Sequence, residues 1–164
     1  MKKFPLVVSV ILFLCHPVYA QTSHDMTSKA GDTGHVVINQ KDLKWMDGPP
    51  TLPKGAKLAV LQGDPSKEGM FTLRLMFPAN FKIAPHWHPT AEYVTVVEGE
   101  FYMGSGPNFD EKKSMMLTPG GYATMPAKFV HFAFAKTNCV VQVHAMGPFA
   151  INYVNSADDP RNKQ

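Results

Sequence analysis

The sequence predicts an all-β fold, a sandwich or barrel built from many short strands. Two observations predict it. From residue 57 onward, short apolar runs alternate with turn residues such as Gly, Pro, Asn and Asp, at a spacing typical of sandwiches and barrels. Helical signals are almost absent, because only residues 108–113 offer a helix, and this helix would have one or two turns.

The predicted strands follow one another along the chain from residue 57 to residue 154. The segment before them, residues 47–55, contains three prolines that deny both a helix and a central strand, so it is turn and extended chain. The run 92–97 is rich in β-branched residues and stops at a Glu-Gly-Glu turn. The full set of predicted strands is 57–61, 70–77, 92–97, 101–103, 122–125, 131–135, 139–146 and 151–154.

The first 20 residues have the form of a signal peptide. Lys2 and Lys3 give a basic start, residues 6–14 form an apolar run, and Val18 and Ala20 place small residues at the spacing of a cleavage site. The apolar run is shorter than the roughly 20 residues that a membrane-spanning helix needs, which argues against the alternative of a retained anchor. We therefore expect cleavage near Ala20 and a periplasmic or secreted protein.

The remaining chain has the length of one domain. We divide it into a flexible polar leader at 21–44, a β-barrel domain at 45–155 and a polar C-terminal tail at 156–164. Cys15 falls within the predicted signal peptide, so Cys139 is left alone and no internal disulfide can form. Lys and Arg number 16 against 13 Asp and Glu, and no basic stripe is present. We therefore expect no nucleic-acid partner and no stable membrane insertion.

A cluster of potential metal ligands begins at residue 86. His86 and His88 are two residues apart, and because a strand alternates its faces, their side chains project to the same side. Glu92 follows across Pro89, whose fixed φ helps to turn the chain back, and His131 opens a later predicted strand. Three imidazoles and one carboxylate would hold one divalent ion, and they suit iron, manganese, nickel, copper or zinc without selecting among them.

Around these residues the sequence resembles the cupins. The first cupin motif has the form G-x5-H-x-H-x3-E-x6-G, and this chain supplies its histidines, its glutamate and its closing glycine at that spacing, as His86, His88, Glu92 and Gly99. Asn80 stands at the leading glycine. Asparagine tolerates the left-handed backbone conformation that a turn at this position requires. The first motif therefore keeps every predicted ligand.

The second cupin motif has the form G-x5-P-x-G-x2-H-x3-N. Gly120, Pro126 and His131 match it, whereas Lys128 replaces its inner glycine and Ala135 its closing asparagine. These departures affect the turn and leave the ligand in place. The resemblance implies a double-stranded β-helix or jelly roll of a small single-domain cupin, with the four predicted ligands around one metal ion inside the barrel.

Three further polar residues have open roles. Arg74 shares a strand face with Thr72, while four large apolar residues occupy the other face. Because that apolar face needs burial, we expect Arg74 to point outward; the alternative is an inward clamp on a substrate carboxylate. Gln142 and His144 share a face, for which a substrate contact and a place on the outer surface are both open. The other arginine of the chain, Arg161, lies in the predicted tail.

Two functions of different class fit the predicted site. One is a metalloenzyme that acts on a small organic molecule, with Glu92 as ligand and general base, and the cupin resemblance favours dioxygenase-like oxidation. The alternative is a non-catalytic binding or sensing module in which tetrahedral zinc leaves no open position. Residues 93–97 are apolar on both faces, which indicates a second layer or a partner subunit, and we expect a homodimer.

Overall fold

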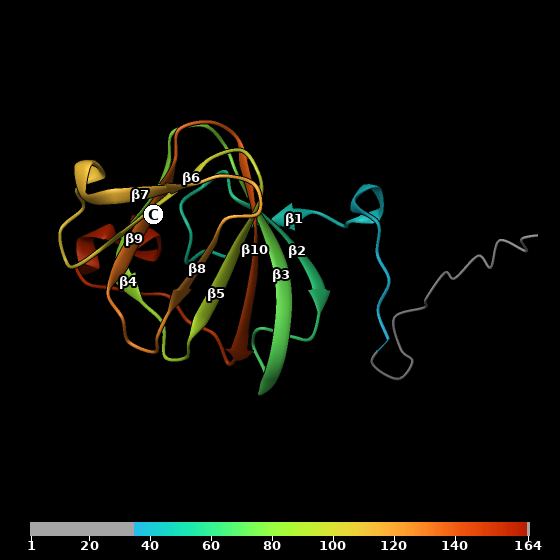
Figure 1. Ribbon diagram of the computed structural model, residues 1–164. Coiled ribbons are helices and arrows are strands. Elements are labelled where there is room, and N and C mark those ends of the chain that lie inside the picture. Colours follow the sequence, from blue (N-terminus) through green and yellow to red (C-terminus); the bar gives the residue numbers. More distant parts are fainter. Residues whose placement is uncertain (1–34, 164) are drawn as a thin grey trace, which may run out of the picture.

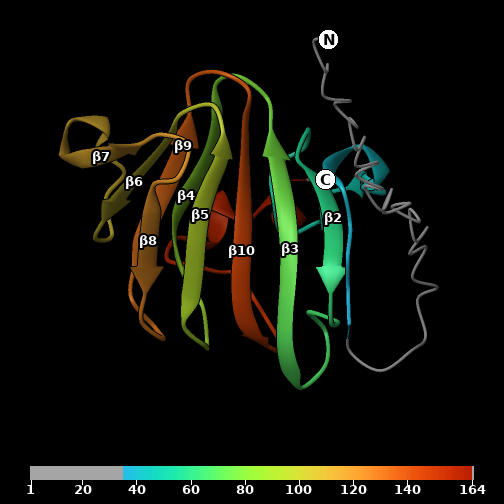
Figure 2. The ribbon, with the colours of Figure 1, turned by 45° about the vertical axis from the view of Figure 1, so that its right-hand side comes forward.

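The computed structural model describes residues 35–163, which form two antiparallel β-sheets that face each other (Figure 1). The first sheet has six strands in the order β1-β2-β3-β10-β5-β8, and Figure 2 shows its long strands side by side. The second sheet has five strands in the order β11-β4-β9-β6-β7. The prediction of an all-β fold is confirmed.

The elements are short, and the only helical segments of the described residues are single 3-10 turns. Among these residues no helix has the length and apolar character needed to cross a membrane. The six-stranded sheet contains β1 (Met46–Asp47), β2 (Lys57–Gln62), β3 (Gly69–Phe77), β5 (Glu92–Glu98), β8 (Tyr122–Met125) and β10 (Cys139–Gly147). The five-stranded sheet contains β4 (Phe81–Trp87), β6 (Phe101–Ser105), β7 (Ser114–Leu117), β9 (His131–Ala135) and β11 (Asn152–Tyr153). The turns are η1 (Gln40–Asp42), η2 (Glu111–Lys113), η3 (Ser156–Asp158) and η4 (Pro160–Asn162).

Three strands, β1, β4 and β7, are absent from the set predicted from the sequence. β4 contains Pro85, which has no N–H to give to a sheet, and its pairing with β9 is irregular between Ile83 and His86, on either side of that proline. The helix expected at 108–113 is reduced to the 3-10 turn η2. The Asp110 side chain accepts a hydrogen bond from the Lys112 N–H and so caps this turn.

The core lies between the two sheets and is joined by stacked aromatic rings. Phe77 of β3 lies between Phe81 of β4 and Phe101 of β6, with ring centroids 4.7 and 5.7 Å apart. All three rings are buried. Alternate residues of the six-stranded sheet complete this layer, as period-two patterning requires. They are Phe71, Leu73, Val94, Val96, Val141 and Val143.

The turns of the two sequence motifs keep their left-handed backbone. Gly99 has φ of +74°, and a Cβ on it would lie 2.2 Å from the Asn138 carbonyl oxygen, so only glycine fits there. Asn80 and Lys128 replace glycines of the cupin pattern, yet both keep φ at 63°. The two departures from the pattern therefore leave the turn geometry intact.

Both ends of the barrel domain carry additional chain. The predicted signal peptide at 1–20 lies outside the described residues, as does most of the predicted leader, of which residues 35–44 include η1. After β11, the Val154 N–H donates to the Pro85 carbonyl oxygen at 2.9 Å and holds the chain beside β4. The predicted tail then forms η3 and η4.

Candidate metal centre

Three histidines from two neighbouring strands converge inside the barrel. His86 lies near the end of β4, His88 follows just after it, and His131 is the first residue of β9. His86 and His131 are register partners on paired strands, and their ring centroids lie 4.2 Å apart. One ring nitrogen from each of the three lies within 4.8 Å of the others, and all three residues are buried. The cluster could hold a metal ion.

Backbone carbonyl oxygens orient each of the three rings. The Nδ1 atoms of His86 and His88 lie 2.8 Å from carbonyl oxygens, and that of His131 lies 3.0 Å from one. A proton on Nδ1 is donated to the carbonyl, so the Nε2 lone pair is left for an ion. The carbonyl acceptors belong to Ala84, Ala150 and Phe129.

The Glu92 carboxylate completes the group from the first position of β5. Its Oε2 lies 3.4 Å from Nε2 of His88 and 3.5 Å from Nε2 of His131. The 3.4 Å between Glu92 Oε2 and His88 Nε2 is longer than an ordinary hydrogen bond. His88 Nε2 is fully buried, yet it has no hydrogen-bond partner among the described residues. A buried nitrogen lone pair that faces a carboxylate is the arrangement that a cation would satisfy.

The protonation states of the cluster also fit a cation. Burial, and after it the neighbouring His131 and His88, lowers the pKa of His86 to about 3, so its imidazole is neutral at pH 7. Burial alone would raise the pKa of Glu92, but its contacts with His131 and His88 outweigh burial and hold that pKa below its usual value. A neutral imidazole beside an ionised carboxylate is the donor set that divalent transition metals bind.

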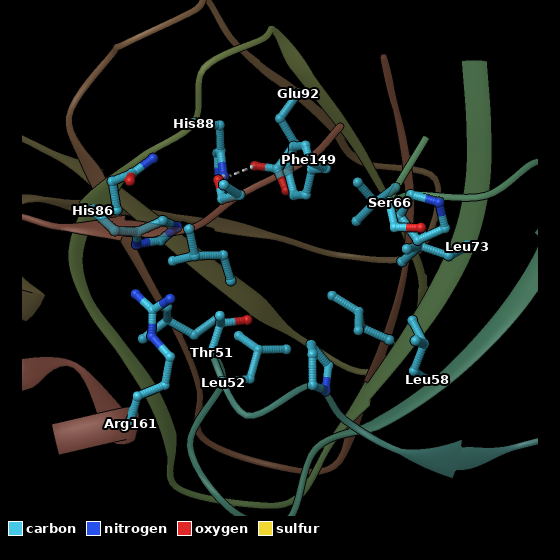
Figure 3. A pocket seen from close by; sticks show the side chains of 18 residues that line it. Thr51, Leu52, Leu58, Ser66, Leu73, His86, His88, Glu92, Phe149 and Arg161 are labelled. Atoms are coloured by element: carbon cyan, nitrogen blue, oxygen red, sulfur yellow. Dashed lines mark hydrogen bonds and ion pairs between the residues drawn. The ribbon is translucent and has the colours of Figure 1, made fainter. Parts of the chain in front are cut away.

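A cavity of about 420 Å³ opens beside the cluster, between the two sheets. His86, His88 and Glu92 lie in its wall, and Phe149 stacks on the His88 ring with a centroid distance of 4.4 Å (Figure 3). The volume is suited to a small organic molecule. The rest of the wall is mostly apolar, and it includes Leu52, Leu58, Leu73, Leu75, Ile83, Val143 and Ile151.

The predicted outward position of Arg74 is confirmed. It lies on the outer face of the six-stranded sheet, where its Nε donates to Oε1 of Gln142 at 3.2 Å. His144 is on the same face, with Nδ1 2.9 Å from the Thr72 hydroxyl and Nε2 3.1 Å from the Gln142 amide nitrogen. Arg74, Gln142 and His144 therefore take no part in the histidine cluster. For Gln142 and His144, the structure supports the outer surface over a substrate contact.

Two residues of the cavity wall escaped the sequence analysis. Phe149 follows β10 in a segment without periodicity, and nothing in the sequence marks it as a neighbour of His88. Arg161 was placed in the polar tail, yet η4 carries it into the cavity wall. The rarity of arginine was a usable signal, because the chain has only two and the other is Arg74.

Comparison with known proteins identifies relatives of the sequence and of the fold. A family described as "Domain of unknown function (DUF4437)" matches residues 13–152. Curated proteins give no match.

Three solved structures illustrate the likeness of fold. The polyketide cyclase RemF from Streptomyces resistomycificus has a TM-score of 0.63 and 19% identity, over 77% of this chain and 89% of that chain. An RmlC-like cupin from Shewanella frigidimarina has a TM-score of 0.54 and 18% identity, over 70% and 91%. An oxalate oxidase has a TM-score of 0.51 and 22% identity, over 78% and 67%. Identities this low show the fold alone, and the fold is the cupin jelly roll that the sequence motifs implied.

Proposed function

Because the chain belongs to the DUF4437 family, whose description assigns no activity, we propose a function from the site itself: a metalloenzyme that acts on a small organic molecule. In this proposal His86, His88, Glu92 and His131 hold one divalent ion. The observation that carries it is the buried Nε2 of His88, which has no hydrogen-bond partner in residues 35–163 and faces the Glu92 carboxylate at the wall of an apolar cavity. The proposal starts from the site because one fold can support many unrelated functions.

We propose oxidation of the organic molecule with dioxygen as the reaction class. A bound iron, manganese, nickel or copper ion would supply the redox chemistry, and the protein would supply binding and orientation. The carbonyl-bound imidazoles keep the ligand nitrogens aimed at one point, and the apolar wall excludes water. Glu92 is the one carboxylate in the cavity wall of the described chain, so it is the group that can accept a proton from a bound substrate. The oxalate oxidase with this fold supports the choice by analogy only.

Metal analysis followed by oxygen uptake tests the proposal. We expect natively purified protein to carry about one transition-metal ion per chain, and oxygen consumption to appear with members of a panel of phenolic and thiol substrates. Protein that carries no ion and takes none up in dialysis contradicts the proposal. A four-coordinate zinc with no exchangeable water would instead support the alternative function, a non-catalytic binding or sensing module.

Replacing Glu92 by glutamine is expected to weaken metal binding at least about tenfold and to remove turnover. The substitution keeps the shape of the side chain and removes its charge, and even partners one step removed from a metal contribute about 10–100-fold in affinity. The measurement is calorimetric metal titration of the purified variant. Glu98→Gln, an exposed glutamate at the other end of the same strand, is the matched control and should bind metal as the unaltered protein does. Equal affinities in the two variants would exclude Glu92 as a ligand.

We also propose that the protein is a homodimer that pairs through the outer face of its six-stranded sheet. Five large apolar side chains on this face are exposed, and exposed apolar patches of this kind mark interaction surfaces. Light scattering is expected to give twice the chain mass, and Met146→Glu to give a monomer with the same fold. A monomer for the unaltered protein would contradict the proposal. The five residues are Met70, Met76, Tyr93, Tyr122 and Met146.

Export is the third part of the proposal. The basic start, the apolar run at 6–14 and the small residues before position 21 support it. Expression of the full chain in a bacterial host is expected to release protein into the periplasm or medium with residue 21 at its N-terminus, as N-terminal sequencing would show. Recovery of the uncleaved chain from the cytoplasm would speak against export.

A further inference from the structure

In the described part of the chain, the wall of the cavity beside the histidine cluster contains one permanently charged cation. Among the described residues that line the cavity, Arg161 is the only arginine or lysine, and its neighbours are largely apolar. Figure 3 shows the guanidinium end of Arg161 directed toward His86. The Arg161 side chain is 48% exposed, so its guanidinium lines the cavity and also remains accessible to solvent.

The Asp159 carboxylate pairs with Arg161 and sets the direction of its side chain. The Arg161 Nε donates to Asp159 Oδ1 at 2.9 Å, and its Nη2 donates to Oδ2 at 2.6 Å. The same carboxylate accepts a hydrogen bond from the Arg161 backbone N–H at 3.0 Å and so caps η4. This two-point pairing uses one edge of the guanidinium. Nη1 on the other edge takes part in no hydrogen bond among residues 35–163.

We propose that the substrate of this site is a small organic anion, a carboxylate with an apolar body, and that Arg161 binds its carboxylate. The inference rests on the proposed function. The free edge of Arg161 offers donors in the planar geometry that matches a carboxylate, and the leucine-rich wall accepts the apolar body. Charge favours the same ligand. A divalent ion keeps one positive charge beside Glu92, whereas Asp159 neutralises Arg161, so the loaded cavity suits a monoanion.

The test compares two probes of the same shape and different charge, 3-phenylpropanoate and 3-phenylpropanamide. Both are titrated calorimetrically into zinc-loaded protein. The carboxylate is expected to bind about tenfold more tightly than the amide, because hydrogen bonds to charged groups contribute more than neutral ones. In Arg161→Gln most of this preference should disappear while zinc stoichiometry stays at that of the unaltered protein. The control is Arg74→Gln, which removes the other arginine of the chain. Because Arg74 lies on the outer face of the six-stranded sheet, this variant should keep the preference for the carboxylate.

A second readout uses the folded, unaltered protein. Because the chain has only two arginines, a ¹⁵N spectrum contains two Arg Nε–H signals, and Arg74→Gln assigns them. The carboxylate probe is expected to shift the Arg161 signal and to leave the Arg74 signal in place, and the amide probe should move neither. An unmoved Arg161 signal overturns the inference, as does an undiminished carboxylate preference in Arg161→Gln, which would assign anion binding to the metal alone. Either of these results would leave the proposed metal site unaffected. If the protein failed to take up zinc, the proposed function itself would be contradicted.

Discussion

Alanine at position 88 is expected to abolish stoichiometric metal uptake. His88 carries the buried Nε2 that no described residue satisfies, and it faces the Glu92 carboxylate at 3.4 Å. Without His88, two imidazoles and one carboxylate remain. We expect the affinity for the metal ion to fall by at least about 100-fold, because even residues that only hydrogen-bond to a metal ligand contribute up to about 100-fold. Equilibrium dialysis followed by elemental analysis measures the effect, which should exceed that of Glu92→Gln because no donor replaces the imidazole.

The matched control is His144→Ala. His144 is a partly buried histidine of β10, and it hydrogen-bonds to Thr72 and Gln142 on the outer face of the six-stranded sheet. We expect this variant to bind one ion with the affinity of the unaltered protein. Circular dichroism must show that both variants retain the β fold. If His88→Ala kept one tightly bound ion per chain, the cluster would not be the metal site.

Phe71→Ala is expected to destabilise the metal-free protein by about 3–5 kcal/mol, the usual cost of deleting a fully buried aromatic side chain. Phe71 is 0% exposed, and its ring meets that of Phe149 edge to face at a centroid distance of 5.3 Å. Since Phe149 in turn stacks on His88, the lost ring also removes support for the histidine cluster. Urea unfolding measures the loss, which is a large fraction of the about 5–15 kcal/mol that typical domains possess.

Phe129→Ala provides the control, because the same atoms are removed from a ring that is 43% exposed. A surface substitution of this kind costs little, and we expect less than about 1 kcal/mol. If both variants lost a similar free energy of unfolding, packing between the two sheets would not be the main source of stability. A retained midpoint in Phe71→Ala would lead to the same conclusion.

Local patterns in the sequence predicted most of the strands and the four residues that the structure brings together, His86, His88, Glu92 and His131. The period-two alternation of 70–77 placed Arg74 outside and its apolar neighbours inside, as the structure confirms. β4 escaped, because Pro85 weakens the strand signal and its pairing with β9 is irregular beside that proline. The two-residue spacing of His86 and His88 was enough to predict that their side chains share a side, although β4 ends at Trp87 and His88 follows it.

Residue order alone was enough to predict a strand-rich fold, the cupin motifs and the residue types offered to a metal ion. Three contacts became known only from the folded chain: His131 pairs with His86 across β4 and β9, Phe149 stacks on His88, and the tail brings Arg161 to the cavity. The difference arises from sequence separation. Alternation and turn conformation are properties of a few consecutive residues, whereas these contacts depend on the register between distant segments, which packing of the whole core selects.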